Sequence, residues 1–249
     1  MGAFTFESLA CLIAADVVYY YPPSIGHFNF MKQLNGNLVN LNETIYVKGS
    51  EFEVAYDAIV AEVMHAVRAG KKVAYAVQGS PAFHCGTAVR LHRMASREGF
   101  SSILISGVSS FELLSAELSK RCDLTNVQIL SAIQVADGAL SINAHVACLL
   151  FDLGRYALPA VREAPGTLVR AKLSALADRL RAIYPRNHRV SLIYVTSVGD
   201  YHSSITNLID FESALSRFGS GLTIFLPAVR GRHENSTAPK QKRLGALPR

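Results

Sequence analysis

The stretch Lys72-Val-Ala-Tyr-Ala-Val-Gln-Gly-Ser-Pro81 decides the fold of this 249-residue chain. Its first six residues are almost entirely apolar, as in a parallel strand that is covered on both faces. The turn that follows predicts a helix over 82–98, because Ser80 can cap a helix and Pro81 suits the first helical position. A strand, a tight turn and a helix in this order indicate an α/β protein.

The same order of elements repeats after Gly99. Ser102–Ile105 predicts a strand, Gly107-Val-Ser-Ser110 a turn, and Phe111–Lys120 a helix. In open α/β sheets the ligand lies at the carboxyl ends of the strands, where backbone N–H groups at helix N-termini can meet it. The two turns therefore form the predicted ligand site. The alternative is that their serines only cap the helices.

Weaker patterns extend this reading to the rest of the chain. Before the first stretch, we expect a helix over 6–15, strands over 16–21 and 38–41, and an amphipathic helix over 52–69. After the second, we expect a helix over 168–183 and strands over 128–130, 144–152, 189–196 and 221–225. The chain thus divides into an N-terminal α/β lobe over 1–108, a C-terminal mixed-sheet α/β lobe over 109–229, and a disordered basic tail over 230–249.

Charge and composition exclude several classes of protein. Half of the residues are hydrophobic, which is enough for a full core. Of the net charge of +6, +5 falls in residues 230–249, so the body is nearly neutral and we expect no nucleic-acid partner. No apolar run is long enough to span a membrane. The four scattered cysteines and the lack of a secretory leader favour a cytoplasmic protein.

Other chemistries fit the residues less well. The nucleophile elbow of hydrolases needs small residues on both sides of its serine, but Phe111 follows Ser109 and Pro81 follows Ser80. His84 and His92 lie eight positions apart on the predicted helix without a zinc-site spacing, so we expect no metal and interpret both as isolated helix residues. Neither of the common nucleotide-binding glycine motifs occurs.

Several short motifs together resemble the tetrapyrrole (corrin/porphyrin) methylases. They are Ala15-Asp-Val-Val-Tyr-Tyr20, Gly79-Ser-Pro81, Glu98-Gly-Phe100 and Gly107-Val-Ser-Ser110. The tract Val67-Arg-Ala-Gly-Lys-Lys72 and the later Ile183-Tyr-Pro-x-x-His188 are most similar to the borosin branch, the peptide backbone α-N-methyltransferases. The resemblance covers roughly 6–227. It implies a two-lobed tetrapyrrole-methylase fold (class III methyltransferase), a donor cleft between the lobes, and a homodimer.

The resemblance also implies roles for particular residues. S-adenosylmethionine would be the methyl donor, and its site would be lined by Gly79, Ser80, Pro81, Phe83, Ser109, Ser110 and Gln128. Tyr46 and Tyr56 fall where the borosin branch has two active-site tyrosines, which would bind the acceptor or relay its proton. The plain alternative is that Tyr56 packs on the apolar helix stripe and Tyr46 caps a strand.

The chain departs from the branch at two places. Phe52 stands where the branch has an arginine, which removes a strong hydrogen-bond donor. The sequence begins where the glycine-rich turn after the family's first strand is ending, so we expect either that the chain lacks this inner strand or that its true start lies upstream. The leading hypothesis is methyl transfer to a peptide backbone amide supplied in trans, or to another small acceptor. The alternatives are C-methylation of a tetrapyrrole and an inactive, methylase-fold binding subunit.

Overall fold

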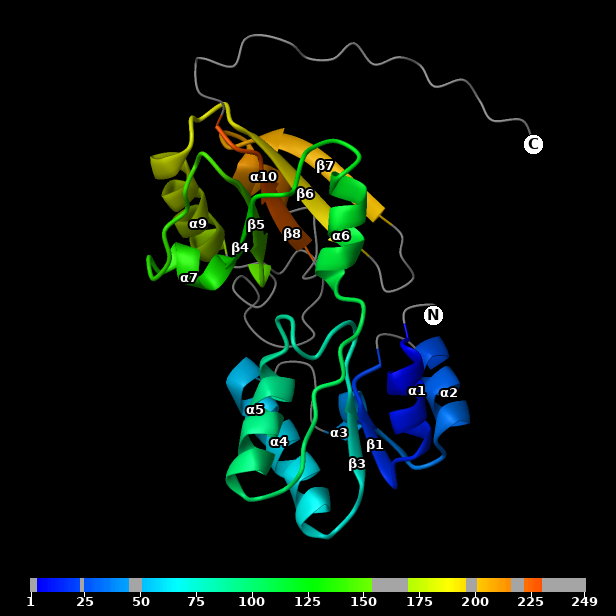
Figure 1. Ribbon diagram of the computed structural model, residues 1–249. Coiled ribbons are helices and arrows are strands. Elements are labelled where there is room, and N and C mark those ends of the chain that lie inside the picture. Colours follow the sequence, from blue (N-terminus) through cyan, green and yellow to red (C-terminus); the bar gives the residue numbers. More distant parts are fainter. Residues whose placement is uncertain are drawn as a thin grey trace, which may run out of the picture.

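The computed structural model describes residues 4–22, 25–44, 51–153, 170–195, 201–215 and 222–229. Two separate sheets organise these residues into a lower and an upper lobe (Figure 1). The lower sheet has three parallel strands in the order β2-β1-β3: β1 is Val17–Tyr20, β2 is Leu38–Asn40 and β3 is Val73–Ala76. The α/β class and the two lobes that the sequence predicts are confirmed.

The lower sheet is covered on both faces. Val17 and Tyr19 point toward α4 (Phe52–Arg68) and α5 (Gly86–Arg97), because alternate residues of a strand face opposite sides. Val18 and Tyr20 point the other way, toward α1 (Phe6–Ile13) and α2 (Ile25–Leu34). The short helix α3 (Leu41–Thr44) follows β2. All four residues of β1 are buried, which explains why its sequence is one apolar run.

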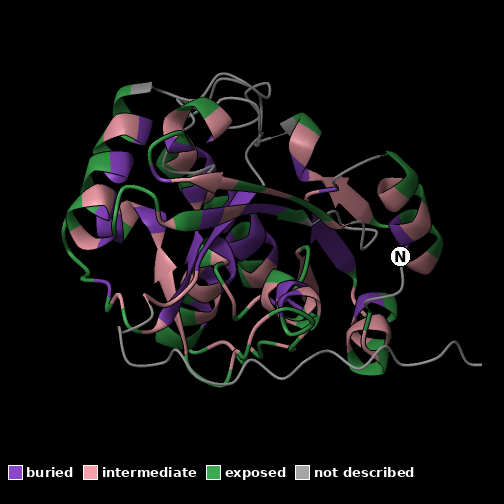
Figure 2. Ribbon diagram, turned by 90° about the horizontal axis from the view of Figure 1, so that it is seen from above, coloured by how far each residue is buried: buried purple, intermediate pink, exposed green. Residues whose placement is uncertain are grey.

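The upper sheet has five strands in the order β4-β5-β8-β6-β7. Its strands are β4 (Val127–Ser131), β5 (Ala147–Phe151), β6 (Arg189–Val195), β7 (Tyr201–Asn207) and β8 (Leu222–Leu226). Only β4 and β5 pair in parallel, and the other neighbours pair antiparallel, so the sheet is mixed as the sequence predicts. Figure 2 shows the buried strands at the centre of the molecule.

Helices cover both faces of the upper sheet. One face packs on α7 (Ala132–Ala136), α9 (Arg170–Ile183) and α10 (Phe211–Leu215). The other face packs on Leu114 and Leu118 of α6 (Ser110–Leu118). The predicted lobe boundary at 108/109 thus falls directly before the first helix that packs on the upper sheet, and it stays a prediction. The basic tail lies outside the described residues.

The predicted strand over 102–105 is wrong. Residues 101–109 run extended beside β3 but belong to no strand (Figure 1). In the described part of the chain, residues 101–108 form no backbone hydrogen bond, and β3 pairs only with β1. Both segments therefore leave backbone groups unpaired along the space between them, and Ile103 is 69% exposed. An apolar sequence can predict a strand, but a strand forms only where a neighbouring strand pairs with its backbone.

The predicted start of the helix over 82–98 is also wrong. Helix α5 begins at Gly86, and Cys85 rather than Ser80 stands at its N-cap position. The cause is local, because Gly79 and His84 have φ values of 80° and 50°, outside the helical range. Residues 79–85 consequently form a loop between β3 and α5. This loop carries most of the predicted site.

Candidate functional site

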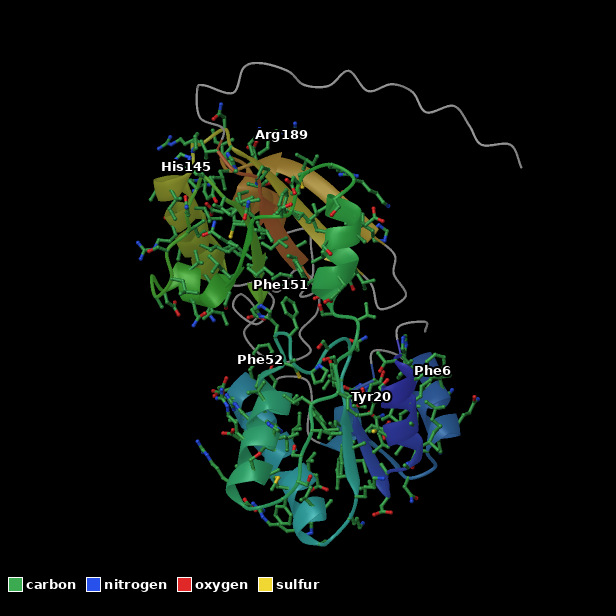
Figure 3. All side chains as sticks on the ribbon, viewed as in Figure 1. Phe6, Tyr20, Phe52, His145, Phe151 and Arg189 are labelled. Atoms are coloured by element: carbon green, nitrogen blue, oxygen red, sulfur yellow. The ribbon has the colours of Figure 1, made fainter. Side chains whose placement is uncertain are left out.

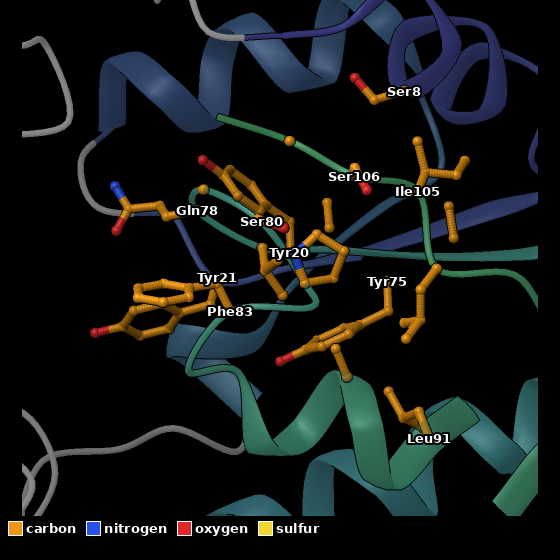
Figure 4. Close-up of a pocket in the computed structure, with 18 of the residues that line it drawn as sticks. Ser8, Tyr20, Tyr21, Tyr75, Gln78, Ser80, Phe83, Leu91, Ile105 and Ser106 are labelled. Atoms are coloured by element: carbon orange, nitrogen blue, oxygen red, sulfur yellow. The ribbon is translucent and has the colours of Figure 1, made fainter. Parts of the chain in front are cut away.

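A large cavity of about 920 Å³ extends along β3 and past its carboxyl end (Figure 4). Its walls come from β3, the 79–85 loop, the 101–110 segment and α5. In Figure 4, Tyr75, Ile105 and Leu91 represent β3, the extended segment and α5 around the cavity. Phe151, Asp152 and Thr223 of the upper lobe also line the cavity, so both lobes contribute to it.

The two predicted turns meet at this cavity through direct backbone contact. A Cβ atom at Gly107 would lie 2.5 Å from the Gly79 carbonyl oxygen. A Cβ atom at Gly79 would lie 3.5 Å from the Val108 carbonyl oxygen, and Gly79 also has the positive φ that glycine tolerates best. Close approach therefore requires glycine at Gly107, a positive φ favours it at Gly79, and the sequence predicted correctly that these turns meet.

Ser109 is held by the helix that it begins. Its Oγ accepts a hydrogen bond from the Phe111 amide at 3.1 Å, and its own amide donates to Glu112 Oε2 at 2.8 Å, which completes a capping box. The Ser109 hydroxyl also donates to the Glu112 carboxylate and is the main cause that lowers the pKa of Glu112. The capping alternative is thus confirmed for Ser109. Its neighbour Ser110 is exposed and lines the cavity as the first residue of α6.

Ser80 has a different environment. It is only 9% exposed, lines the cavity, and caps no helix. Its hydroxyl forms no hydrogen bond with any described residue, although its carbonyl accepts one from the Phe83 amide at 3.2 Å. A nearly buried hydroxyl that faces a cavity without a protein partner is available to a ligand. Pro81 lines the same wall.

Phe83 links the loop to the upper lobe. Its ring lies edge-on to Phe151, with centroids 5.1 Å apart, and 6.1 Å from the ring of Phe111. Figure 3 places Phe151 at the lower end of the upper lobe, facing the lower lobe. Aromatic pairs in these geometries are favourable by about 0.5–1.5 kcal/mol beyond their buried area. Phe83 thus contributes one wall of the cavity and fixes the loop against the other lobe.

His84 belongs to the same aromatic cluster as Phe83 and Phe151, a position that the sequence did not predict. Its ring stacks on Phe151 at 5.0 Å, and its Nδ1 lies 2.9 Å from Oδ2 of Asp152, directly after β5. The interpretation of His84 as an isolated helix residue is wrong, because the residue precedes α5 and contacts the upper lobe. Only a tertiary structure could reveal this contact, since His84 and Asp152 are 68 positions apart.

Tyr56 lies on α4 and lines the large cavity and also a smaller adjoining one of about 430 Å³. The guanidinium carbon of Arg90, on α5, lies 5.9 Å from the centre of the Tyr56 ring. Asp57 and Glu53 hold Arg90 through ion pairs of 2.9 and 2.5 Å. A fixed guanidinium therefore stands beside Tyr56, although Phe52 occupies the position where the sequence analysis expected an arginine.

Two tyrosines that line the cavity, Tyr20 and Tyr75, are uncharged. Burial raises the pKa of Tyr20 to about 12, and burial is also the main cause that raises the pKa of Tyr75. The Tyr75 hydroxyl shares a hydrogen bond of 2.9 Å with Thr87. Figure 4 shows both tyrosines among the lining residues. The cavity is thus mainly apolar and neutral near β3.

One predicted site residue is not among those that line the cavity, and another, Tyr46, lies outside the described residues. Gln128, on β4, uses its side chain to bind the backbone of the 143–146 segment: Nε2 donates to the Asn143 carbonyl at 2.8 Å and Oε1 accepts from the Asn143 amide at 2.9 Å. Gln128 does not line the cavity, so the structure gives its predicted role in donor binding no support.

The described ranges contain neither a metal-binding cluster nor a membrane-spanning helix. No group of three or more His, Cys, Asp or Glu side chains there is arranged to hold a metal ion. No helix there is both long and apolar enough to cross a membrane.

The fold and the cavity define a two-lobed α/β protein whose candidate ligand site lies between two glycine-containing loops and is lined in part by the second lobe. Residues 1–208 match the family of tetrapyrrole (corrin/porphyrin) methylases. The chain belongs to this family of methyltransferases, which confirms the resemblance found in the sequence.

Individual relatives support the same assignment. A methyltransferase/type II borosin cyclic peptide precursor from Phlebiopsis gigantea is 24% identical over 234 residues, which is 90% of this chain and 40% of that protein. A type I borosin precursor from Coprinopsis marcescibilis is 30% identical over 115 residues, covering 46% of this chain and 29% of that protein. The chain therefore spans less than half the length of both curated relatives.

Solved structures share the fold. The uroporphyrin-III-C-methyltransferase of Thermus thermophilus superimposes with a TM-score of 0.61 at 20% identity, over 90% of this chain and 87% of that one. A cobalt precorrin-4 methyltransferase gives a TM-score of 0.60 at 18% identity, over 90% and 88%. At this identity the likeness establishes the two-lobed methylase fold, and the predicted fold class is confirmed.

Proposed function

We propose that this protein binds S-adenosylmethionine in the large cavity and transfers its methyl group to a peptide backbone amide, supplied in trans, or to another small acceptor. The observation that carries the proposal is the meeting of the Gly79 and Gly107 loops at a cavity of about 920 Å³. This volume lies in the range of about 300–1,000 Å³ usual for ligand pockets. The relatives that match most of this chain's length are methyltransferases.

The residues present fit this donor. Close backbone approach at Gly79 and Gly107 leaves main-chain groups, rather than side chains, at the cavity wall. The Ser80 hydroxyl is free to bind a polar group of the ligand, and Phe83 provides an apolar surface. Ser109 contributes through its backbone, because its hydroxyl is engaged with Glu112. When bound, the donor would supply an electrophilic methyl group on a sulfonium.

The acceptor site would be formed around Tyr56. This tyrosine lines both cavities, and the guanidinium of Arg90, paired with Glu53 and Asp57, lies beside its ring. The phenol O–H can donate a hydrogen bond to an acceptor carbonyl or relay a proton. Tyr56 would then orient the acceptor toward the donor methyl for in-line displacement.

A tetrapyrrole acceptor is less well supported. Such a macrocycle carries carboxylates, which proteins recognise through arginine and lysine side chains. Among the described residues that line the two cavities, the only lysine or arginine side chains are Lys72, Arg90 and Arg93, and Arg90 is already paired with Glu53 and Asp57. The lining therefore favours an uncharged acceptor, such as an apolar peptide segment.

Methylation can be tested with a deuterated methyl donor and a pool of synthetic apolar peptides, followed by mass spectrometry. We expect labelled peptides from the wild-type protein. Tyr56→Phe should reduce the rate by about 10²- to 10⁴-fold, the usual contribution of a general acid or base, and leave donor binding unchanged. Tyr194→Phe is the matched control, because Tyr194 lies on β6 of the upper sheet and lines neither cavity. Donor binding without any labelled peptide would contradict peptide methylation, and absence of donor binding would favour an inactive binding subunit.

We also propose that the protein is a homodimer that uses the outer side of α1 and α2. Phe6 and Ile13, seven positions apart on α1, are 93% and 60% exposed, and Ile25 at the start of α2 is 73% exposed. Figure 3 shows Phe6 at the edge of the lower lobe. Light scattering should give twice the chain mass for the wild type and a monomer for Phe6→Glu. A monomeric wild type at micromolar concentration would contradict the proposal.

A further inference from the structure

Two residues other than glycine have a positive φ in the described part of the chain, and they contact each other. His84 has a φ of 50° and Asp152 a φ of 64°. Such conformations cost about 1–3 kcal/mol each and persist where the surrounding structure enforces them. Nδ1 of His84 lies 2.9 Å from Oδ2 of Asp152, so two strained backbones from different lobes converge on one hydrogen bond.

The orientation of the imidazole is fixed on several sides. It stacks on Phe151 with an interplanar angle of 26° and lies edge-on to Phe83, with centroids 4.7 Å apart. An ionised carboxylate can only accept hydrogen bonds, so Nδ1–H donates to Asp152 and the lone pair of the neutral ring resides on Nε2. Nε2 forms no hydrogen bond with the described residues. The His84 and Asp152 side chains are 26% and 23% exposed, which leaves them accessible from the cavities.

The pair also lies where donor and acceptor would meet. His84 and Asp152 line both the large cavity and the adjoining cavity of about 430 Å³. Tyr56, the proposed acceptor-site residue, is the third residue that lines both. A histidine that lines a candidate substrate cavity and binds a carboxylate through Nδ1 has the arrangement of a general base with the residue that orients it.

We propose that His84 is the catalytic base of the methyl transfer and that Asp152 is its positioning residue; this inference rests on the proposed function. In the step, the acceptor nitrogen forms a bond to the methyl carbon. The carbon–sulfur bond breaks with its electron pair on sulfur, and the proton of the acceptor N–H passes to Nε2 of His84. Asp152 stabilises the resulting imidazolium, which then releases the proton to solvent.

The tautomer of His84 can be measured without any acceptor. In the protein labelled with ¹⁵N-histidine, NMR should show His84 as the Nδ1–H tautomer with an unprotonated Nε2. Asp152→Asn should change this tautomer preference, because an amide can donate to Nδ1 where a carboxylate cannot. A wild-type His84 in the Nε2–H form would overturn the proposal, whatever the acceptor is.

Kinetics with the labelled peptide pool provide the second test. His84→Ala should reduce the rate of methyl transfer by about 10²- to 10⁴-fold without changing the donor Kd. Free imidazole should restore part of the rate to His84→Ala, which a merely structural role of the ring does not predict. His65→Gln is the matched control, because His65 is an exposed residue of α4 that lines neither cavity.

The outcomes separate this inference from the proposed function. A wild-type protein that does not bind S-adenosylmethionine would refute the proposed function, independently of the tautomer. If the wild type binds the donor and methylates peptides, and His84→Ala methylates them equally fast, only the role of His84 is refuted.

Discussion

Substitution of Gly107 by alanine tests the contact between the two loops. The new Cβ would lie 2.5 Å from the Gly79 carbonyl oxygen and 3.2 Å from the Gly79 carbonyl carbon. Ordinary contacts begin at 3.4 Å, so the loops must separate by about 0.9 Å. Both partners are backbone atoms, and no flexible side chain can absorb this displacement.

The expected energy follows from the crowding. Overpacking of a well-packed site costs about 1–3 kcal/mol. In a protein of this size, each kcal/mol lowers the Tm by about 2–4 °C, so the Tm of Gly107→Ala should fall by about 2–12 °C. Displacement of a binding loop by about 1 Å can reduce catalysis by about 100-fold. We expect donor affinity to weaken together with the Tm, because the same two loops form the proposed donor site.

Thermal unfolding and calorimetric titration with S-adenosylmethionine would measure both effects. Gly36→Ala is the control, since a Cβ at Gly36 has no atom within 4 Å, and Gly36 does not line the cavity. If Gly107→Ala matched the wild type in Tm and donor affinity, the packing of the Gly79 and Gly107 loops as described would be refuted.

Three further predictions concern stability and local opening. Ser109→Ala removes the cap of α6 and should cost about 0.5–2 kcal/mol of unfolding free energy in denaturant titrations; an unchanged midpoint would exclude the capping role. Burial lowers the pKa of His188 below its ordinary value of 6.5, so the folded protein binds a proton at this site less readily than the unfolded chain does. The contribution of His188 to the stability of the folded state is therefore present above pH 6.5 and is lost as the pH falls. The Tm of the wild type should therefore decrease on acidification more steeply than that of His188→Gln, and parallel curves would contradict this. Amides of 101–108 should exchange hydrogen much faster than those of β1, and equal protection measured by mass spectrometry would show that the extended segment is paired.

The regular elements with strong apolar patterns were predictable from the sequence. The runs at Val17–Tyr20 and Val73–Ala76 are strands, and the stripe over Phe52–Arg68 is a helix, because burial on one or two faces determines these patterns directly. Strand β7, Tyr201–Asn207, was missed because it is an edge strand with several exposed polar residues, and such a strand has little apolar signal.

The candidate site was predictable only in part. The meeting of the Gly79 and Gly107 turns was predictable from two successive strand–turn–helix patterns, although the segment before Gly107 forms no strand. The position of His84 was not, because a positive φ at a histidine and a hydrogen bond to Asp152 depend on tertiary structure. Arg90 was missed beside Tyr56 for a similar reason, since it comes from a different helix and is held there by Glu53 and Asp57.

Calorimetric titration of the wild-type protein with S-adenosylmethionine, and with its demethylated product, tests the central claim most directly. The account predicts saturable binding of both compounds at one site per chain with micromolar affinity, and weaker binding of the donor to Gly107→Ala. A folded wild-type protein that releases no heat of binding with either compound would contradict the assignment of the large cavity as a methyl-donor site.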